Sequence, residues 1–362
     1  MDHEMLIGYS FWGFLGPGIL DTPDGGRSHR RILIDGLCQR GHQPVFLQAN
    51  RDHREAGLDL SDTYRWDSGF PDIDVLFLEW RWPIPGRNTT TCASPGHTCD
   101  LHRQHRLLAH YTRRGVRTII WDKDRRLPIN DPLRAQHNVV ICEAALHPTR
   151  GAVSLLFPVE DTVLDNADAA KLCARPRDLA LAYVGNQYDR DDAFDIYFAP
   201  AAAVHPHLVA GKWTDTAAWP HVRFIGRVPF TQVATIYGRA LTTILLLPDR
   251  YGAVGQMTQR IIEAVTAGCL PLTPASIRSA NTFTPTSLHI DDGAAAAQRI
   301  SELHATAGGP RHTELLEDCL DQLSVFRLSR QLDLLDTVLT SRHAPVGGAM
   351  TGPPAPAATG GT

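Results

Sequence analysis

The chain has 362 residues, of which 43% are hydrophobic and 20% are charged, a composition that excludes a chain disordered throughout. This length is more than one hydrophobic core usually holds, so we expect two domains. The net charge is −4, and residues 1–165 and 166–362 each carry two more acidic than basic side chains. Neither half is basic, so the charge does not indicate a nucleic-acid binder.

The amino-terminal sequence and the cysteines indicate the compartment. No apolar run reaches the ~18 residues of a membrane span, and the start, MDHEMLIGYS, lacks the basic and apolar regions of a signal peptide. The 7 cysteines are odd in number and follow no disulfide spacing. We therefore expect a cytoplasmic chain with free thiols and no membrane span.

In the first half, apolar strands alternate with amphipathic segments, as in a parallel sheet covered on both faces. We expect a helix from Ser28, whose hydroxyl suits an N-cap, to Gly41, and another over residues 100–114. The expected strands are 5–10, 43–48, 75–79, 117–121, 138–143 and 153–157.

A polar connection over residues 159–178 leads to a second alternating series. Its expected strands are 179–185, one near 208, 222–226, 243–247, 270–273 and 288–290. One helix is expected after residue 191, and the others cover residues 230–239, 256–267, 293–307, 312–323 and 326–341. The tail from 344 carries no charge, and we expect it to be disordered. The sequence therefore predicts an α/β fold of two Rossmann-like, doubly wound domains, 1–165 and 166–343, that face a central cleft, followed by the tail 344–362.

The segment Asp249–Pro274, DRYGAVGQMTQRIIEAVTAGCLPLTP, places Arg260 and Glu263 on a helix before a tight turn. It resembles the donor-binding helix of GT-B glycosyltransferases (glycosyl transferases group 1), particularly the spore-maturation-protein-like and phage-associated branches, where an Arg precedes the Glu by three residues. The resemblance implies that Glu263 accepts hydrogen bonds from the ribose of a nucleotide sugar, with Gln259 and Arg260 beside it. The alternative is a solvated glutamate on an amphipathic helix.

A glycine-rich loop, Gly13–Arg31, follows the first strand and precedes LIDGLCQRGHQPVF. In similar GT-B enzymes a glycine pair lies here, which implies that Gly25 and Gly26 let the backbone approach a diphosphate near a helix N-terminus. Turn geometry alone is the alternative. The resemblance also implies that Arg190, after the first strand of the second domain, binds the donor phosphates, and Lys212 is a competing cation.

Four ionisable residues are placed at the strand ends or loops of the first domain, and we expect them on the acceptor side of the cleft: His29, Glu79, Asp122 and Asp124. A carboxylate or a histidine there can serve as general base. Glu79 opens the motif EWRW, whose two tryptophans either bind a sugar or base face or pack under the loop. The pair in WDKD resembles the metal motif of GT-A enzymes, but the paired domains argue against that fold.

The segment Cys92–His105, CASPGHTCDLHRQH, holds two cysteines and three histidines. Six residues separate the cysteines, whereas zinc sites usually have two to four. We therefore expect loop and surface residues here and no metal.

The resemblance implies a glycosyltransferase of the hexosyltransferase type, which moves a sugar from a nucleotide diphosphate sugar to an acceptor hydroxyl without a cofactor or an essential metal. Retaining members carry a further Glu where this chain has Gly255, so that sugar contact is not implied. The alternatives are a sugar-nucleotide epimerase of similar architecture and a non-catalytic two-domain binding protein. Transfer to a modified DNA base stays open, although the balanced charge does not favour a nucleic-acid partner. The sequence identifies neither sugar, nucleoside nor acceptor.

Overall fold

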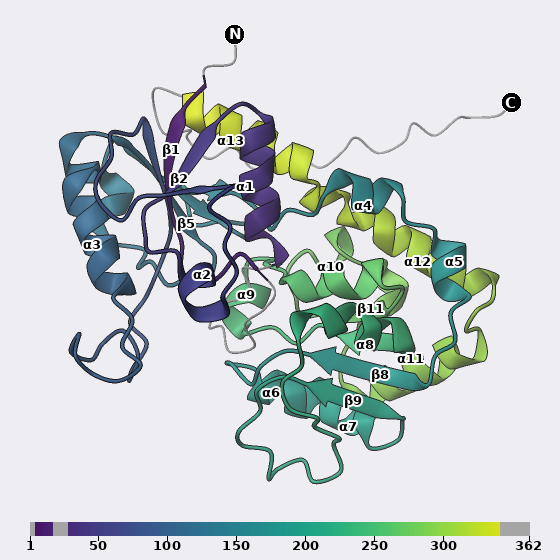
Figure 1. Ribbon diagram of the computed structural model, residues 1–362. Coiled ribbons are helices and arrows are strands. Elements are labelled where there is room, and N and C mark those ends of the chain that lie inside the picture. The colour runs from purple at the N-terminus through teal and green to yellow at the C-terminus, as the bar shows by residue number, and fades with distance from the viewer. Residues whose placement is uncertain (1–3, 17–27, 341–362) are drawn as a thin grey trace, which may run out of the picture.

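The computed structural model describes residues 4–16 and 28–340, which form two lobes, each built on a parallel sheet with helices on its faces (Figure 1). The predicted fold class, two Rossmann-like α/β domains, is confirmed. The predicted tail and the glycine pair Gly25–Gly26 lie outside the described residues.

The first lobe contains a seven-stranded sheet of order β3-β2-β1-β4-β5-β6-β7. Its strands are β1 (Leu6–Ser10), β2 (Gln43–Phe46), β3 (Arg65–Trp66), β4 (Val75–Glu79), β5 (Arg117–Asp122), β6 (Val139–Glu143) and β7 (Val153–Ser154). Alternate side chains of β4 enter different core clusters: Val75 and Phe77 pack in one, Leu76 and Leu78 in the other. Side chains alternate across a strand, so this central strand is apolar and buried on both faces.

The helices of the first lobe are α1 (Arg30–Gln39), α2 (Arg51–Ala56) and α3 (Asp100–His110). The predicted N-cap of α1 is wrong, because the N-cap residue is His29 rather than Ser28, and the His29 side chain makes no capping hydrogen bond. The predicted helix over 100–114 is interrupted after His110, and a 3-10 turn, Thr112–Arg114, completes it.

The second lobe has a five-stranded sheet of order β12-β11-β10-β8-β9. Its strands are β8 (Leu179–Val184), β9 (His207–Ala210), β10 (Ala240–Ile244), β11 (Leu270–Pro274) and β12 (His289–Ile290). The strand predicted at 222–226 is wrong: this segment makes only an isolated bridge between Phe224 and Val209.

The helices of the second lobe begin in the polar connection, which contains two short ones that the sequence did not predict. The two short helices are α4 (Asp161–Asp165) and α5 (Ala169–Cys173). The helices that follow are α6 (Asp191–Ala193), α7 (Ala199–Ala202), α8 (Val233–Arg239), α9 (Asp249–Gly252), α10 (Gln259–Thr266), α11 (Gly293–Ala305) and α12 (Pro310–Gln322).

The last described helix, α13 (Leu328–Thr340), returns to the first lobe and lies beside α1 (Figure 1). Its apolar stripe, which includes Leu332 and Leu335, joins the cluster that holds Leu33 and Leu37 of α1. The sequence grouped this helix with the second domain, whereas its apolar face packs on α1 of the first lobe.

The chain therefore crosses between the lobes near 159 and again near 327. The two crossings are paired: the Val159 N–H donates to Phe326 O and the Leu328 N–H donates to Val159 O, both at 2.8 Å. None of the helices in the described ranges is long and apolar enough to span a membrane.

Candidate active site

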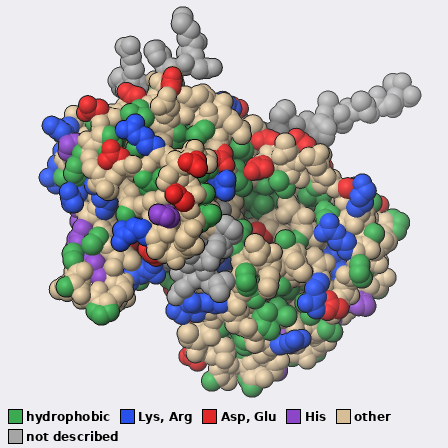
Figure 2. Space-filling view, in the orientation of Figure 1, with side chains coloured by type: hydrophobic (Ala, Val, Ile, Leu, Met, Phe, Trp, Pro, Cys, Tyr) green, Lys and Arg blue, Asp and Glu red, His purple; other side chains and the backbone are tan. Residues whose placement is uncertain are grey.

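A cleft of about 690 Å³ lies between the two lobes. Figure 2 shows the lobes in space-filling form. The first-lobe wall of the cleft consists of the start of α1, the loop after β4, the loop after β5 and Phe157. Its second-lobe wall consists of the ends of β8 and β9, the segment before α8, and α10 with the loop before it. The carboxyl ends of parallel strands thus border the cleft, as expected for a ligand site in an open α/β sheet.

The cleft is basic, although the chain carries a net charge of −4. Its lining has two carboxylates, those of Asp124 and Glu263, against seven cationic side chains: Arg87, Lys123, Arg126, Arg190, Lys212, Arg227 and Arg260. A concave surface with this excess of cations concentrates anions. The described part of the cleft is therefore suited to a ligand with several negative charges.

Arg260, at the start of α10, is held by main-chain and side-chain contacts of the second lobe. Its Nε donates to Val184 O at 2.6 Å and its Nη1 lies 3.4 Å from Thr258 Oγ1. The guanidinium covers Gly185, where an added Cβ would lie 2.3 Å from Arg260 Nε. The absence of a side chain at Gly185 therefore makes room for Arg260 at the end of β8.

Glu263 follows Arg260 by three residues, so both lie on one face of α10 and both line the cleft. Glu263 is half-buried, and Gln259 beside it is 8% exposed. The Gln259 Nε2 is buried and has no hydrogen-bond partner among residues 4–16 and 28–340. The three predicted donor residues of α10 are thus brought together, with one buried amide donor left for a ligand.

The backbone at Gly255 leaves no room for a glutamate at this position. Gly255 has φ +61°, and a Cβ there would lie 2.7 Å from Arg278 O. A side chain at this position would be strained and would clash with main chain.

Arg190, which is only 6% exposed, lines the same wall. Its Nε donates to Leu246 O at 3.2 Å, and its Nη1 donates to the carbonyls of Asn186 and Tyr188. Burial lowers the pKa of Arg190 below its ordinary value, yet an arginine stays charged at neutral pH. Lys212 is exposed and also lines the cleft, so the structure places both predicted phosphate partners there.

Glu79 is buried at the end of β4 in a cluster of charges. Its Oε1 accepts from Arg30 Nε at 2.8 Å and from the Tyr9 hydroxyl at 3.0 Å, and its Oε2 accepts from Arg30 Nη2 and Lys123 Nζ, both at 2.6 Å. Burial opposes ionisation, but Arg30 and Lys123 outweigh it and hold the pKa of Glu79 well below its ordinary value. Glu79 does not line the cleft, and its bonds fit it to position Lys123 rather than to accept a proton.

His29 lies in the cleft at the N-cap of α1, packed against Trp121 and Phe157. The side chain is 3% exposed, and neither ring nitrogen has a hydrogen-bond partner within the described ranges. Burial, then Lys123 and Arg30, lowers the pKa of His29 well below its ordinary value, although Glu79 opposes them. The imidazole is therefore neutral at pH 7 and can accept a proton or a hydrogen bond.

The two carboxylates of WDKD have different surroundings. Asp122 accepts the N–H groups of Arg126 at 2.9 Å and Leu127 at 2.8 Å, and burial raises its pKa to about 6 although these bonds oppose the rise. It caps a turn and does not line the cleft. Asp124 does line the cleft, and its Oδ1 accepts the Tyr251 hydroxyl at 2.6 Å.

The two tryptophans of EWRW separate. Trp80 packs against a core cluster of the first lobe, whereas Trp82 lines the cleft and makes an edge contact with Trp12. Asn88 holds this loop, because its amide donates to Trp82 O at 3.0 Å and accepts from the Ile84 N–H at 2.7 Å. The loop thus presents one aromatic face to the ligand.

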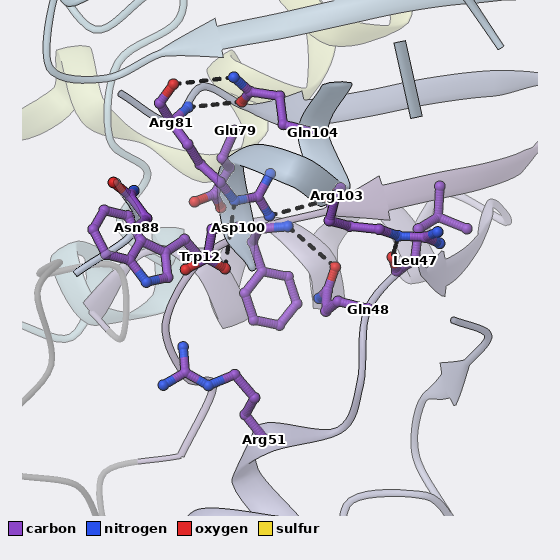
Figure 3. Close-up of polar contacts among 12 residues, drawn as sticks. Trp12, Leu47, Gln48, Arg51, Glu79, Arg81, Asn88, Asp100, Arg103 and Gln104 are labelled. Atoms are coloured by element: carbon purple, nitrogen blue, oxygen red, sulfur yellow. Dashed lines mark hydrogen bonds and ion pairs between the residues drawn. The ribbon is translucent and has the colours of Figure 1, made fainter. Parts of the chain in front are cut away.

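Beneath this loop, Arg81 is bonded to α3 (Figure 3). Its N–H donates to Gln104 Oε1 at 2.9 Å and its carbonyl accepts from Gln104 Nε2 at 3.0 Å. Its Nη2 donates to Ser10 Oγ at 3.1 Å, and its Nε lies 3.9 Å from Asp100 Oδ1. These contacts fix the loop after β4, which carries Trp82 and Asn88 and is called the cleft loop below, relative to β1 and α3.

Several contacts across the cleft were not predicted from the sequence. Gln256 Nε2 donates to Lys123 O at 2.6 Å, Arg126 Nη2 donates to Asp189 Oδ2 at 3.0 Å, and Arg250 Nε donates to Asp124 O at 3.2 Å. The partners are about 60 to 130 residues apart, so no local pattern identifies them. They join the loop after β5 to the second lobe.

Comparison with known proteins agrees with this geometry at the level of the fold. No protein-family model and no curated protein matches the chain. A T4 phage β-glucosyltransferase in complex with UDP and Mn²⁺ superposes with a TM-score of 0.65 at 13% identity, over 93% of this chain and 100% of that one. An α-glucosyltransferase in complex with UDP-glucose and DNA containing an abasic site gives 0.57 at 12%, over 94% and 100%.

AviGT4, a glycosyltransferase involved in avilamycin A biosynthesis, gives a TM-score of 0.51 at 12% identity, over 92% of this chain and 98% of that one. The chain therefore has the GT-B fold of glycosyltransferases. The spore-maturation-protein-like branch stays a prediction.

Proposed function

We propose that the protein is a glycosyltransferase that takes a sugar from a nucleotide diphosphate donor and transfers it to an acceptor hydroxyl. The observation that carries the proposal is the Arg260–Glu263 pair on one face of α10, directed into a basic cleft at the end of β8. Glu263 offers two acceptor oxygens to the vicinal hydroxyls of a ribose. Arg260 and Arg190 offer fixed positive charge to the diphosphate.

In this reaction the bond between the anomeric carbon and the diphosphate breaks while the acceptor oxygen bonds to that carbon. Negative charge develops on the leaving diphosphate, and cations held by main-chain carbonyls stabilise it without reorganising. Arg260 bonded to Val184 O and Arg190 bonded to Leu246 O meet this requirement.

The first-lobe wall supplies the acceptor side of the proposal. Trp82 and Phe157 line it, and they suit a flat acceptor group such as an aromatic ring or a nucleobase. His29 is the proposed general base, because its neutral imidazole has no hydrogen-bond partner in the described chain. A lowered pKa makes it a weak base, so the leaving-group stabilisation above carries much of the barrier reduction. Asp124 is the second candidate for the base.

The donor half is tested by calorimetry with UDP, GDP, TDP and ADP. We expect one nucleoside diphosphate to bind, and Glu263→Ala to weaken it by about 1.5–3 kcal/mol, as for hydrogen bonds to a charged group. Glu317→Ala, an exposed glutamate on α12, is the matched control. Wild-type affinity of Glu263→Ala would contradict the donor site.

The transfer half is tested with the sugar nucleotide that binds, with and without acceptors. A DNA duplex with a hydroxyl-bearing modified base and small aromatic alcohols form the acceptor panel, since one structural neighbour was solved as a DNA-modifying enzyme and another in complex with DNA. A glycosylated acceptor supports the proposal. Interconversion of the sugar nucleotide without an acceptor would identify an epimerase, and binding without turnover of any panel member would favour a binding protein.

A further inference from the structure

The long loop before α3 can be followed in Figure 1. This loop and the start of α3 bring together four residues of the segment Cys92–His105, for which the sequence predicted no metal. We call them the Cys–His cluster: Cys92, His97, Cys99 and His102. One ligand atom from each lies within 4.8 Å of all the others. Among residues 4–16 and 28–340 no other group of His, Cys and carboxylates meets this criterion, and no member lines the cleft.

The separations match those of a metal tetrahedron. Zinc bonds of about 2.3 Å to sulfur and 2.0–2.1 Å to nitrogen place two sulfurs about 3.8 Å apart, and a sulfur and a nitrogen about 3.6 Å apart. The observed distances are 3.9 Å from Cys99 Sγ to Cys92 Sγ and 3.4 Å from Cys92 Sγ to His102 Nδ1. A disulfide needs its sulfurs at about 2.05 Å, so the cysteines are arranged as neighbouring ligands and not as a bonded pair.

His97 has the surroundings of a metal ligand. Its Nδ1 lies 3.2 Å from Thr90 Oγ1, and its Nε2 is buried without a partner among the described residues. A hydrogen bond to one imidazole nitrogen orients the ring so that the other can bind a metal. The buried Nε2 is the independent sign that this cluster takes a ligand.

We propose that the Cys–His cluster is a structural zinc site. Two thiolates and two imidazoles form a closed four-ligand set, which leaves no position for substrate. The sequence pattern agrees once each cysteine is paired with a histidine: four residues separate Cys92 from His97, and two separate Cys99 from His102. Both intervals fall within the two to four residues that usually separate paired zinc cysteines, whereas the interval of six between Cys92 and Cys99 does not.

The site links the cleft loop to α3. Cys99 is the N-cap residue of α3, and His102 lies in its first turn, while Cys92 and His97 belong to the loop. The Thr98 N–H donates to Arg87 O at 3.1 Å, and Arg87 lines the cleft. Asp100, next to Cys99, faces Arg81. Zinc bound here would hold the wall that carries Trp82 against the helix.

The first test is the metal content of the full chain purified under reducing conditions, measured by mass spectrometry. We expect one zinc per chain in the wild type, and loss of that zinc in Cys99→Ser and in His102→Asn. His105→Asn, an exposed histidine of the same helix, should keep the metal.

The second test uses the wild-type chain alone, so it does not depend on whether the variants fold. After removal of metal by a chelator, titration with Co²⁺ should give thiolate-to-cobalt absorption at one equivalent. Zinc should protect Cys92 and Cys99 from alkylation, mapped by peptide mass spectrometry, while exposed Cys38 reacts at the same rate with or without metal.

The proposal is overturned if the reduced chain binds neither Zn²⁺ nor Co²⁺ through its thiols. It is also overturned if Cys92 and Cys99 form a disulfide that resists a cytosolic reduction potential. The readouts are metal content and thiol protection, so their result does not depend on whether the protein binds a nucleotide.

Discussion

The two walls of the cleft differ in how their charges are held. In the second lobe, Arg190 and Arg260 are bonded to main-chain carbonyls and have no buried carboxylate partner in the described contacts. In the first lobe, Lys123 is paired with Glu79 and Arg126 with Asp189, and the neutral side chains of His29, Trp82 and Phe157 line the same wall. Uncompensated charge suits an anionic diphosphate, and a neutral aromatic surface suits the group that attacks. Four predictions test this difference.

The largest effect is expected on transfer from His29→Ala. Loss of a general base lowers rates by about 10²–10⁴-fold, while nucleotide affinity should stay unchanged because the proposed donor site is on the other wall. Because the pKa of His29 lies well below its ordinary value, the rate should not fall as the pH drops from 7.5 through ~6.5. His137→Ala, at an exposed position, is the control. Equal loss of nucleotide affinity would show that the walls are not separate.

Next in size, Glu79→Gln should lower the free energy of unfolding by about 3–5 kcal/mol, because Arg30 and Lys123 would remain buried without a counter-charge. The folded-state pKa of Glu79 is depressed, so its contribution is fully present above ~4.3, the ordinary glutamate value, and decreases as the pH falls below it.

Urea unfolding at pH 7 and pH 4 measures this contribution, with exposed Glu160→Gln as the control. An unchanged midpoint at pH 7 for Glu79→Gln would mean that the two cations do not depend on this carboxylate.

Gly185→Ala should weaken nucleotide binding by about 1.5–3 kcal/mol, because its Cβ displaces the guanidinium of Arg260 without altering charge. The matched control is Gly238→Ala, where the nearest atom to the new Cβ is at 3.8 Å. Calorimetry of both variants and of Arg260→Gln decides the point. If only Arg260→Gln loses affinity, the position of the guanidinium matters less than its charge.

The smallest effect is expected from Arg126→Ala, which removes the bond to Asp189 between the walls. Exposed ion pairs contribute about 0–1 kcal/mol and are screened by salt. A small loss of stability in the urea midpoint should disappear at 1 M NaCl. A larger loss that persists in salt would show that the packing of Arg126 on Tyr188 holds the lobes together.

The sequence was sufficient where the information is local. The run Val75–Glu79 predicted β4 with its observed bounds, and the resemblance of the segment Asp249–Pro274 singled out Arg260 and Glu263, which both line the cleft on α10. The strand predicted at 222–226 was wrong although Val222, Phe224 and Ile225 are apolar, because Phe224 packs against the core with only an isolated bridge to Val209.

The missing information is mostly long-range. Glu79 looks like a free carboxylate in sequence, but its partners Arg30 and Lys123 lie 49 and 44 residues away. The return of α13 to the first lobe depends on the match between its apolar stripe and α1, which no pattern within α13 reveals. The clustering of His97 with Cys99 and His102 required the fold of the loop before α3.

The paired crossings near Val159 and Arg327 determine how the lobes can move. Two hydrogen-bonded connections side by side resist twisting of one lobe against the other more than a single linker does. The least hindered motion is therefore a hinge rotation of the lobes about an axis through the two crossings. Each opening would then return the arginines of one wall to the same position relative to His29 and Trp82. A chain cut before α13 would lose that guided motion while keeping every residue of the cleft lining.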